Sequence, residues 1–202
     1  MAPVERVLIS AGLSLIAGVD EAGRGSCAGP LVVAAVILPD PESKPWTEIN
    51  DSKKLTESTR ERLYEKIITG AISYSIIEIS VSEIDLSGLH RSNLEGMRRA
   101  VLALDRNPQY VLTDGYAIEG LNVPSVGIWK GDQVSVNIGA ASILAKVFRD
   151  RIMKDLDELY PEYGLGKHKG YLTPTHSNAL IKFGATQIHR KSFANISALE
   201  RK

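Results

Sequence analysis

Apolar residues recur along the chain in runs and alternations that predict five β-strands. Residues 31–38 form a continuous apolar run of the buried type, which the following prolines end. Ile72, Tyr74 and Ile76 alternate with other residues, as in a strand with one covered face. The predicted strands are residues 13–20, 31–38, 72–76, 110–113 and 126–130.

Helical spacing appears in three further segments. Ser58 and Glu61 fit a capping box that opens a helix ending at Gly70, and a second helix is predicted over residues 89–106. An apolar stripe predicts a third helix, which Pro161 ends. The stripe is Leu144, Phe148, Ile152, Leu156 and Leu159, with Lys146, Arg149, Asp150 and Lys154 off it. Strands and helices in this order predict an α/β fold in which helices cover a mixed sheet.

The start of the chain contains an apolar run, residues 7–19, that superficially suggests a signal peptide. The run is too short to span a bilayer, and it continues into Asp20 and Glu21 without a small-residue cleavage site. We therefore interpret it as a buried strand. Cys27 is the one cysteine, so no internal disulfide can form, which favours a reducing compartment. We expect a cytoplasmic protein without membrane association.

The end of the chain differs in charge from the rest. The whole chain has a formal net charge of zero, whereas residues 164–202 hold seven Lys and Arg against one Glu, a net charge of +6. A basic end fits a polyanionic partner, although the charge alone fits a solvated tail equally well. We expect a core at residues 1–160 and a helical extension at residues 161–202.

Four carboxylates stand where predicted strands end or loops begin: Asp20, Glu21, Asp114 and Asp132. The last two lie in Asp-Gly and Gly-Asp pairs, which are also common in ordinary turns. The first two follow an apolar strand, where unpaired carboxylates are costly unless a positive group joins them. Since neighbouring side chains of a strand face opposite ways, both can serve one site only if the chain breaks there. Gly23 and Gly25 would permit that break.

Carboxylate oxygens are ligands suited to Mg²⁺ or Mn²⁺. A zinc site is excluded because Cys27 has no partner cysteine at zinc spacing. The glycines after Asp20 lead into a strand rather than a helix and miss the dinucleotide spacing, which excludes a Rossmann site. Residues 164–167 lack the spacing and the Ser/Thr of a phosphate-binding P-loop, and no Gly-x-Ser-x-Gly elbow supports a serine hydrolase.

Seven sequence blocks resemble the ribonuclease HII family, the bacterial type 2 ribonucleases H. They are AGVDEAGRG at residues 17–25, NDSKKL at 50–55, DG at 114–115, KGD at 130–132, AASILAKV with RD at 140–150, HKGY at 168–171 and HRKSF at 189–193. The order and number of the blocks, which run from residue 17 to residue 193, support the resemblance over nearly the whole chain. The resemblance implies a ribonuclease H-like mixed five-stranded sheet flanked by helices, with a C-terminal helical extension that completes the substrate groove.

The resemblance also implies the chemistry. The carboxylates Asp20, Glu21, Asp114 and Asp132 would hold two divalent cations, Mg²⁺ or Mn²⁺, and catalyse in-line hydrolysis that leaves a 3′-hydroxyl and a 5′-phosphate. The substrates would be RNA–DNA hybrids and DNA duplexes with a single embedded ribonucleotide, cut on its 5′ side. The loop Gly23-Arg24-Gly25 would read the ribose through close backbone approach, because a 2′-hydroxyl both donates and accepts hydrogen bonds. We expect the enzyme to be a monomer.

Other residues carry more open expectations. We expect Lys53 and Lys54 to contact phosphates. His168 fits a phosphate donor or proton relay, and equally a satisfied loop histidine. Ser142 fits close packing, and His90 and His176 fit structural roles.

Tyr171 lies in the basic segment with no apolar stripe around it, which predicts an exposed stacking platform. By resemblance, it would pack on the deoxyribose 3′ of the ribonucleotide, where a 2′-hydroxyl would clash with the ring.

Two competing functions remain open from the residues alone. Another ribonuclease H-like nuclease, such as a junction resolvase or an integrase, would use similar acids on DNA without a ribose. The Gly-Arg-Gly block argues against it. A non-catalytic nucleic-acid-binding module would have no need of four acids, which repel phosphate unless cations intervene.

Overall fold

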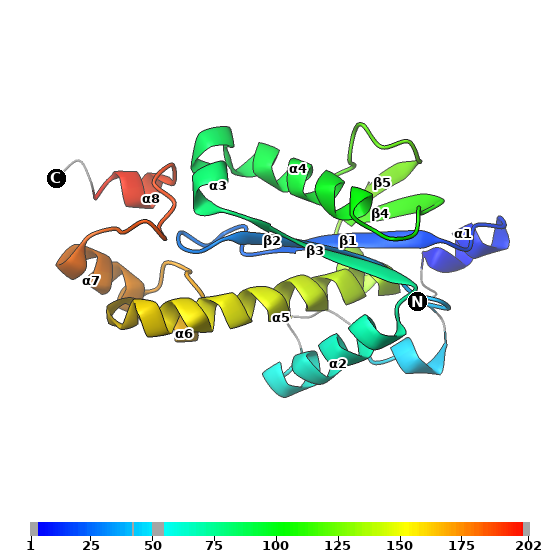
Figure 1. Cartoon of the computed structure of the whole chain (residues 1–202), viewed down its shortest axis with the longest axis horizontal. Coiled ribbons are helices and arrows are strands. Elements are labelled where there is room, and N and C mark those ends of the chain that lie inside the picture. The colour runs from blue at the N-terminus through cyan, green and yellow to red at the C-terminus, as the bar shows by residue number, and fades with distance from the viewer. Residues whose placement is uncertain (1–3, 42, 50–54, 200–202) are drawn as a thin grey trace.

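The computed structural model describes residues 4–41, 43–49 and 55–199, and its centre is one mixed sheet (Figure 1). The strand order is β3-β2-β1-β4-β5. β1 pairs antiparallel with β2 and parallel with β4, and β2 pairs antiparallel with β3. The strands are β1 (Ile16–Ala22), β2 (Leu31–Ile37), β3 (Ser73–Ile79), β4 (Tyr110–Asp114) and β5 (Ser125–Ile128). The predicted mixed five-stranded sheet is confirmed.

Helices cover both faces of this sheet. In Figure 1, α4 lies above the sheet, and α5 and α2 lie below it. The described α-helices are α1 (Glu5–Ser10), α2 (Glu57–Gly70), α3 (Val81–Ser87), α4 (Leu89–Leu102), α5 (Val136–Leu159), α6 (Leu165–His168), α7 (Pro174–Phe183) and α8 (Ala194–Ser197). The 3-10 turns are η1 (Lys44–Trp46), η2 (Gly131–Gln133) and η3 (Pro161–Tyr163). No helix within residues 4–41, 43–49 and 55–199 is long and apolar enough to cross a membrane.

The N-terminal apolar run is not one strand, so that prediction is wrong. Its first part belongs to α1, and β1 begins only at Ile16. The cause is a long-range contact: the buried carboxylate of Glu5 accepts hydrogen bonds from Ser135 Oγ at 2.6 Å and Asn137 N at 2.9 Å. A negative charge there is stabilised by the unpaired N–H groups at the start of α5.

Several predicted helix limits also shift. Thr56, not Ser58, caps α2 by accepting from Thr59 N, so the expected capping box is absent there. A complete capping box occurs instead at Ser80 and Glu83, which open the unpredicted helix α3. The second predicted helix, α4, ends at Leu102 rather than at residue 106.

The predicted third strand is confirmed as β3, but the alternating apolar residues are not its most buried side chains. Ser73 and Ser75 are buried, whereas Ile72 and Tyr74 are more than a third exposed. Ser75 Oγ donates to the carbonyl of Ala100 on α4 at 2.6 Å, so this polar side chain is accommodated in the core by a hydrogen bond.

Helix α5 packs directly on β1. A Cβ at Gly18 would lie 2.1 Å from the carbonyl carbon of Asn137, so only glycine allows this approach. Two features of the predicted stripe are wrong. Leu159 is largely exposed, and Arg149, expected off the stripe, is 2% exposed.

The C-terminal helices extend beyond the end of the sheet with an apolar cluster of their own (Figure 1). The cluster also takes in Cys27 and Ala28 from the β1–β2 loop and Met153 from α5. The division at residue 160 stays a prediction.

Candidate active site

Asp20 and Asp114 lie near the carboxyl-terminal ends of two neighbouring interior strands of the sheet, β1 and β4. β1 and β4 run parallel, and their register pairs Val19 with Thr113, so each acid is the next residue of its strand. Both acids line a cavity of about 450 Å³. The cavity is lined by Asp20, Glu21, Ala22, Gly23, Arg24, Gly25, Arg60, Asp114, Ser142, Lys146, Arg149 and Tyr171.

The chain does not break at Asp20 and Glu21, contrary to the prediction. Both residues lie within β1, which continues to Ala22. The expected turn follows at Gly23, whose φ of +88° favours glycine. The two side chains leave opposite faces of the strand, yet both line the cavity because it lies at the strand's end.

The neighbouring carboxylates raise the cost of ionising Asp20. Burial, followed by the negative charges of Glu21 and Asp114, raises the pKa of Asp20 well above its ordinary value. Hydrogen bonds from the Ser142 side chain and the Glu21 backbone, the latter at 2.7 Å, act in the opposite direction. A cation bound among these oxygens would relieve both the repulsion and the burial cost, so the donor set fits a hard divalent ion.

Asp132 occupies a different position from the other three acids. It is 7% exposed, on η2, and it does not line the cavity. Its loop nevertheless contacts the site, because Gly131 N donates to Asp114 Oδ1 at 2.7 Å. Within residues 4–41, 43–49 and 55–199, no three His, Cys, Asp or Glu side chains are grouped closely enough to hold a metal ion by themselves. The structure therefore brings three of the four predicted acids into one cavity.

The loop Gly23-Arg24-Gly25 forms the next part of the cavity wall. A Cβ at Gly23 would lie 1.9 Å from Nε of Arg149, so the loop can rest on that guanidinium only as glycine. A Cβ at Gly25 would lie 3.6 Å from the Tyr171 ring, which therefore packs close to the loop.

The Arg24 side chain is held in place from two sides. Its Nη2 donates to the Tyr116 hydroxyl at 3.1 Å, and its guanidinium lies 4.9 Å from the centroid of the Tyr116 ring. Its Nη1 is 3.8 Å from Glu21 Oε1. The hydrogen bond from Arg24 to Tyr116 is the main cause that raises the pKa of Arg24.

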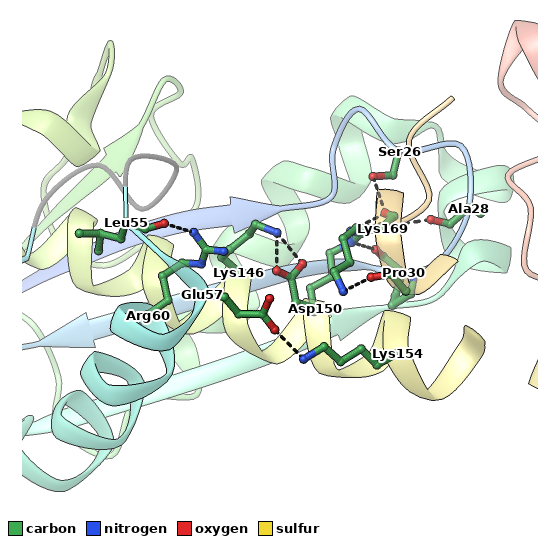
Figure 2. A network of polar contacts seen from close by, with 12 residues as sticks. Ser26, Ala28, Pro30, Leu55, Glu57, Arg60, Lys146, Asp150, Lys154 and Lys169 are labelled. Atoms are coloured by element: carbon green, nitrogen blue, oxygen red, sulfur yellow. Dashed lines mark hydrogen bonds and ion pairs between the residues drawn. The ribbon is translucent and has the colours of Figure 1, made fainter. Parts of the chain in front are cut away.

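Four lining residues were missed by the sequence interpretation: Arg60, Ser142, Lys146 and Arg149. Lys146 Nζ contacts both carboxylate oxygens of Asp150 at 2.5 Å, as Figure 2 shows. In the same view, Arg60 Nη1 donates to the Leu55 carbonyl at 2.6 Å. Ser142, predicted to be a packing residue, instead hydrogen-bonds Asp20.

The remaining predicted site residues differ in placement. Tyr171 is 48% exposed and lines the cavity. His168 does not line it and is the last residue of α6. Its Nε2 lies 2.8 Å from the Tyr163 carbonyl oxygen, whereas its buried Nδ1 has no hydrogen-bond partner among the described residues, so the expectation of a satisfied loop histidine is wrong. Lys53 and Lys54 lie outside the described residues. Arg190, counted in the basic segment, is fully buried.

Comparisons with known proteins agree on one family. The model described as Ribonuclease HII matches residues 17–196. A ribonuclease HII of Corynebacterium jeikeium is 54% identical over 196 residues, covering 96% of this chain and 94% of that protein. A ribonuclease HII of Nocardioides sp. is 52% identical over 192 residues, covering 95% of this chain and 80% of that protein.

A solved structure shows the same fold. The crystal structure of ribonuclease H2 from Pyrococcus horikoshii matches with a TM-score of 0.78 and 27% identity, covering 92% of this chain and 97% of that one. The mixed sheet with its flanking helices is thus the ribonuclease H-like fold. The chain belongs to the ribonuclease HII family, metal-dependent endoribonucleases that cut the RNA strand of RNA–DNA hybrids.

Proposed function

We propose that this enzyme also cuts on the 5′ side of a single ribonucleotide embedded in duplex DNA, leaving a 3′-hydroxyl and a 5′-phosphate. In this proposal Asp20, Glu21, Asp114 and Asp132 hold two divalent cations, Mg²⁺ or Mn²⁺. The observation that carries it is one cavity in which two acids from parallel neighbouring strands face a glycine loop and an exposed tyrosine.

The carboxylates would bind the cations, and hydrogen bonds from neighbouring groups already orient two of them. When bound, the cations would supply activation of a water and stabilisation of the departing 3′ oxygen. Asp20 is oriented by its hydrogen bonds from Ser142 and the Glu21 backbone. Asp114 is oriented by Gly131 N, and this bond ties η2, with Asp132, to the same site. Two of the acids thus have defined orientations without a cation.

The loop Gly23-Arg24-Gly25 and Tyr171 would recognise the ribose. The absence of a Cβ at the exposed Gly25 leaves its backbone accessible to a 2′-hydroxyl, which requires both a donor and an acceptor, whereas the missing Cβ of the buried Gly23 lets the loop pack on Arg149. Arg24, fixed by Tyr116, supplies a positive charge beside the acids. The exposed ring of Tyr171 would stack on the deoxyribose that follows the ribonucleotide. Lys53, Lys54 and His168 remain weaker candidates for phosphate contacts, and we expect a monomer in solution.

The test is a cleavage assay on a DNA duplex that contains one ribonucleotide, with Mg²⁺, Mn²⁺ or a chelator. The matched controls are an all-DNA duplex and a long RNA–DNA hybrid of related sequence. We expect a single metal-dependent cut 5′ to the ribonucleotide and none in the all-DNA duplex. Cleavage of the hybrid alone would overturn the single-ribonucleotide proposal, and cleavage of the all-DNA duplex would overturn ribose recognition.

A further inference from the structure

Three histidines of the C-terminal extension form a compact cluster next to the Tyr171 backbone. The rings of His168 and His176 stack at 4.5 Å between centroids with an interplanar angle of 17°. Nε2 of His176 and Nε2 of His189 lie 3.1 Å apart, and both residues are fully buried. Two nitrogens at this distance share one proton, so one ring must donate and the other must accept.

The surrounding contacts decide which ring donates. Nδ1 of His189 lies 3.0 Å from the backbone nitrogen of Thr186, which can only donate. His189 Nδ1 is therefore the acceptor, and the proton of the neutral ring sits on Nε2. His189 Nε2–H then donates to His176 Nε2, which leaves the proton of His176 on Nδ1.

The last donor of this series faces Tyr171. His176 Nδ1 lies 3.1 Å from the carbonyl oxygen of Tyr171, which also accepts from Thr173 N at 2.9 Å. The sulfur of Cys27 lies 3.7 Å from the same Nδ1. The hydrogen bonds thus run in one direction, from the Thr186 backbone through two imidazoles to the Tyr171 carbonyl.

The chain of donors requires both rings to be neutral. A second proton on either ring would place two N–H groups against each other at the 3.1 Å contact. Burial lowers the pKa of His176, and burial together with the nearby His176 lowers the pKa of His189 to about 4. The series is therefore intact at neutral pH.

Tyr171 is otherwise held by a loop with little regular structure. Lys169 and Gly170 have φ values of +51° and +81°. The loop is joined to the β1–β2 loop by the bond from Cys27 N to the Gly170 carbonyl at 3.0 Å. The ring itself is half exposed, so its position over Gly25 depends on where its backbone is fixed.

We propose that His176 and His189 are positioning residues, whose directional imidazole relay fixes the Tyr171 backbone and so sets the place of its ring beside Gly25. This inference rests on the proposed role of Tyr171 at the junction between ribonucleotide and DNA. The two histidines touch neither substrate nor the reacting atoms, and they act through Tyr171.

One test needs no substitution. Nitrogen-15 NMR of the histidine rings at neutral pH identifies which nitrogen of each ring carries the proton. We expect the Nδ1–H form for His176 and the Nε2–H form for His189. A doubly protonated ring, or His176 in the Nε2–H form, would overturn the relay.

The second test uses a matched pair of substitutions at one position. An asparagine amide can place its nitrogen where Nδ1 of histidine lies, whereas a glutamine amide reaches the place of Nε2. His176→Asn should therefore keep the donor to Tyr171, and His176→Gln should lose it. We expect His176→Gln to lower kcat/KM at a single ribonucleotide by about three- to tenfold relative to a long hybrid, the size of one buried hydrogen bond. His176→Asn should restore most of that loss.

Two controls separate the possible failures. Thr186→Ala removes a hydroxyl of the cluster but keeps the backbone donor, so it should leave the substrate preference unchanged. In a Tyr171→Ala background, His176→Gln should have no further effect on preference, because both act through one ring. If Tyr171→Ala alone leaves the preference unchanged, the proposed role of Tyr171 fails. If Tyr171→Ala changes it and folded His176→Gln does not, the relay fails.

Discussion

The two walls of the cavity are built in different ways. The acidic wall stands on paired strands, where the register of β1 and β4 places Asp20 beside Asp114. The glycine-loop wall has almost no strand pairing, and its carbonyls are bound by buried side chains. Arg149 donates to the carbonyls of Pro30, Lys169 and Ala28 at 2.9, 3.0 and 3.1 Å.

Arg190 has the same function on the other side of that loop. It donates to the carbonyls of Gly29 and Arg24 at 3.0 and 3.1 Å. Buried carbonyls need donors, and in this loop the two guanidiniums donate to the carbonyls of Arg24, Ala28, Gly29 and Pro30. The acidic wall is therefore fixed by the sheet, whereas the glycine-loop wall is fixed by a few cationic and imidazole groups.

The largest effect should come from the acidic wall. Asp20→Asn or Asp114→Asn should reduce cleavage by at least about a hundredfold, close to 3 kcal/mol in barrier, because an amide is a poorer ligand for a hard cation. The fold should survive, since strand pairing rather than the carboxylate holds the residue. Single-turnover rates with Mg²⁺ and circular dichroism measure both. A rate within about tenfold of the parent enzyme would remove that acid from the site.

The glycine-loop wall should be more sensitive than the acidic wall to the loss of a single supporting side chain. Arg149→Met leaves the buried carbonyls of Pro30 and Ala28 without their guanidinium donor, whereas the Lys169 carbonyl still accepts from Ser26 Oγ at 3.3 Å. The substitution should lower the free energy of unfolding by about 3 kcal/mol. Urea denaturation measures this change. Arg151→Met is the matched control, because Arg151 pairs with Glu61 and Glu65 at the surface and should cost less than about 1 kcal/mol. Equal losses would mean that the buried guanidinium has no special role.

Tyr171→Ala should separate recognition from catalysis. We expect it to slow cutting at a single embedded ribonucleotide roughly five- to a hundredfold more than within a long RNA tract, as loss of one stacking contact of about 1–3 kcal/mol would do. The measurement is kcat/KM on both substrates, with circular dichroism as the check on folding. Equal losses would make the tyrosine a general binding contact, and no loss would make it a packing residue.

The last effect concerns acid pH. The pKa of His189 is lowered to about 4 in the folded chain, against about 6.5 when unfolded. The unfolded chain therefore takes up the proton first, and stability contributed by the neutral ring is lost as pH falls from about 6.5 to about 4. We expect a loss on the order of 2–3 kcal/mol in this window.

Asp20 must be removed from that measurement, because its raised pKa has the opposite sign: its ionisation lowers stability as pH rises. The experiment is urea denaturation of the Asp20→Asn variant at several pH values. A stability independent of pH between about 6.5 and 5 would contradict a neutral buried His189.

The sequence predicted what depends on local pattern. Asp114 follows a short apolar strand, so its place at a strand end could be read directly, and Tyr171 was expected to be exposed because no apolar stripe surrounds it. Groups whose partners are distant in the chain were missed. Glu5 appeared to precede a strand, because its partners Ser135 and Asn137 are about 130 residues away.

The roles of side chains whose hydrogen-bond partners meet them only in the folded chain could not be predicted from the sequence either. Arg149 falls on the polar face of its helix by periodicity, and nothing in that pattern shows that its three acceptors will meet there. Ser142 was assigned to packing because it stands among small residues, yet it hydrogen-bonds Asp20. In both cases the determining contact exists only after the chain has folded.

The close approach of β1 and α5 at Gly18 has one further consequence. Gly18 and Asp20 lie on the same face of β1, and α5 carries Ser142. The spacing between an acid and its hydroxyl partner is therefore set by main chain against main chain, with no side chain as a spacer. A substitution among the surrounding apolar residues should therefore change this separation less than any side chain added at position 18.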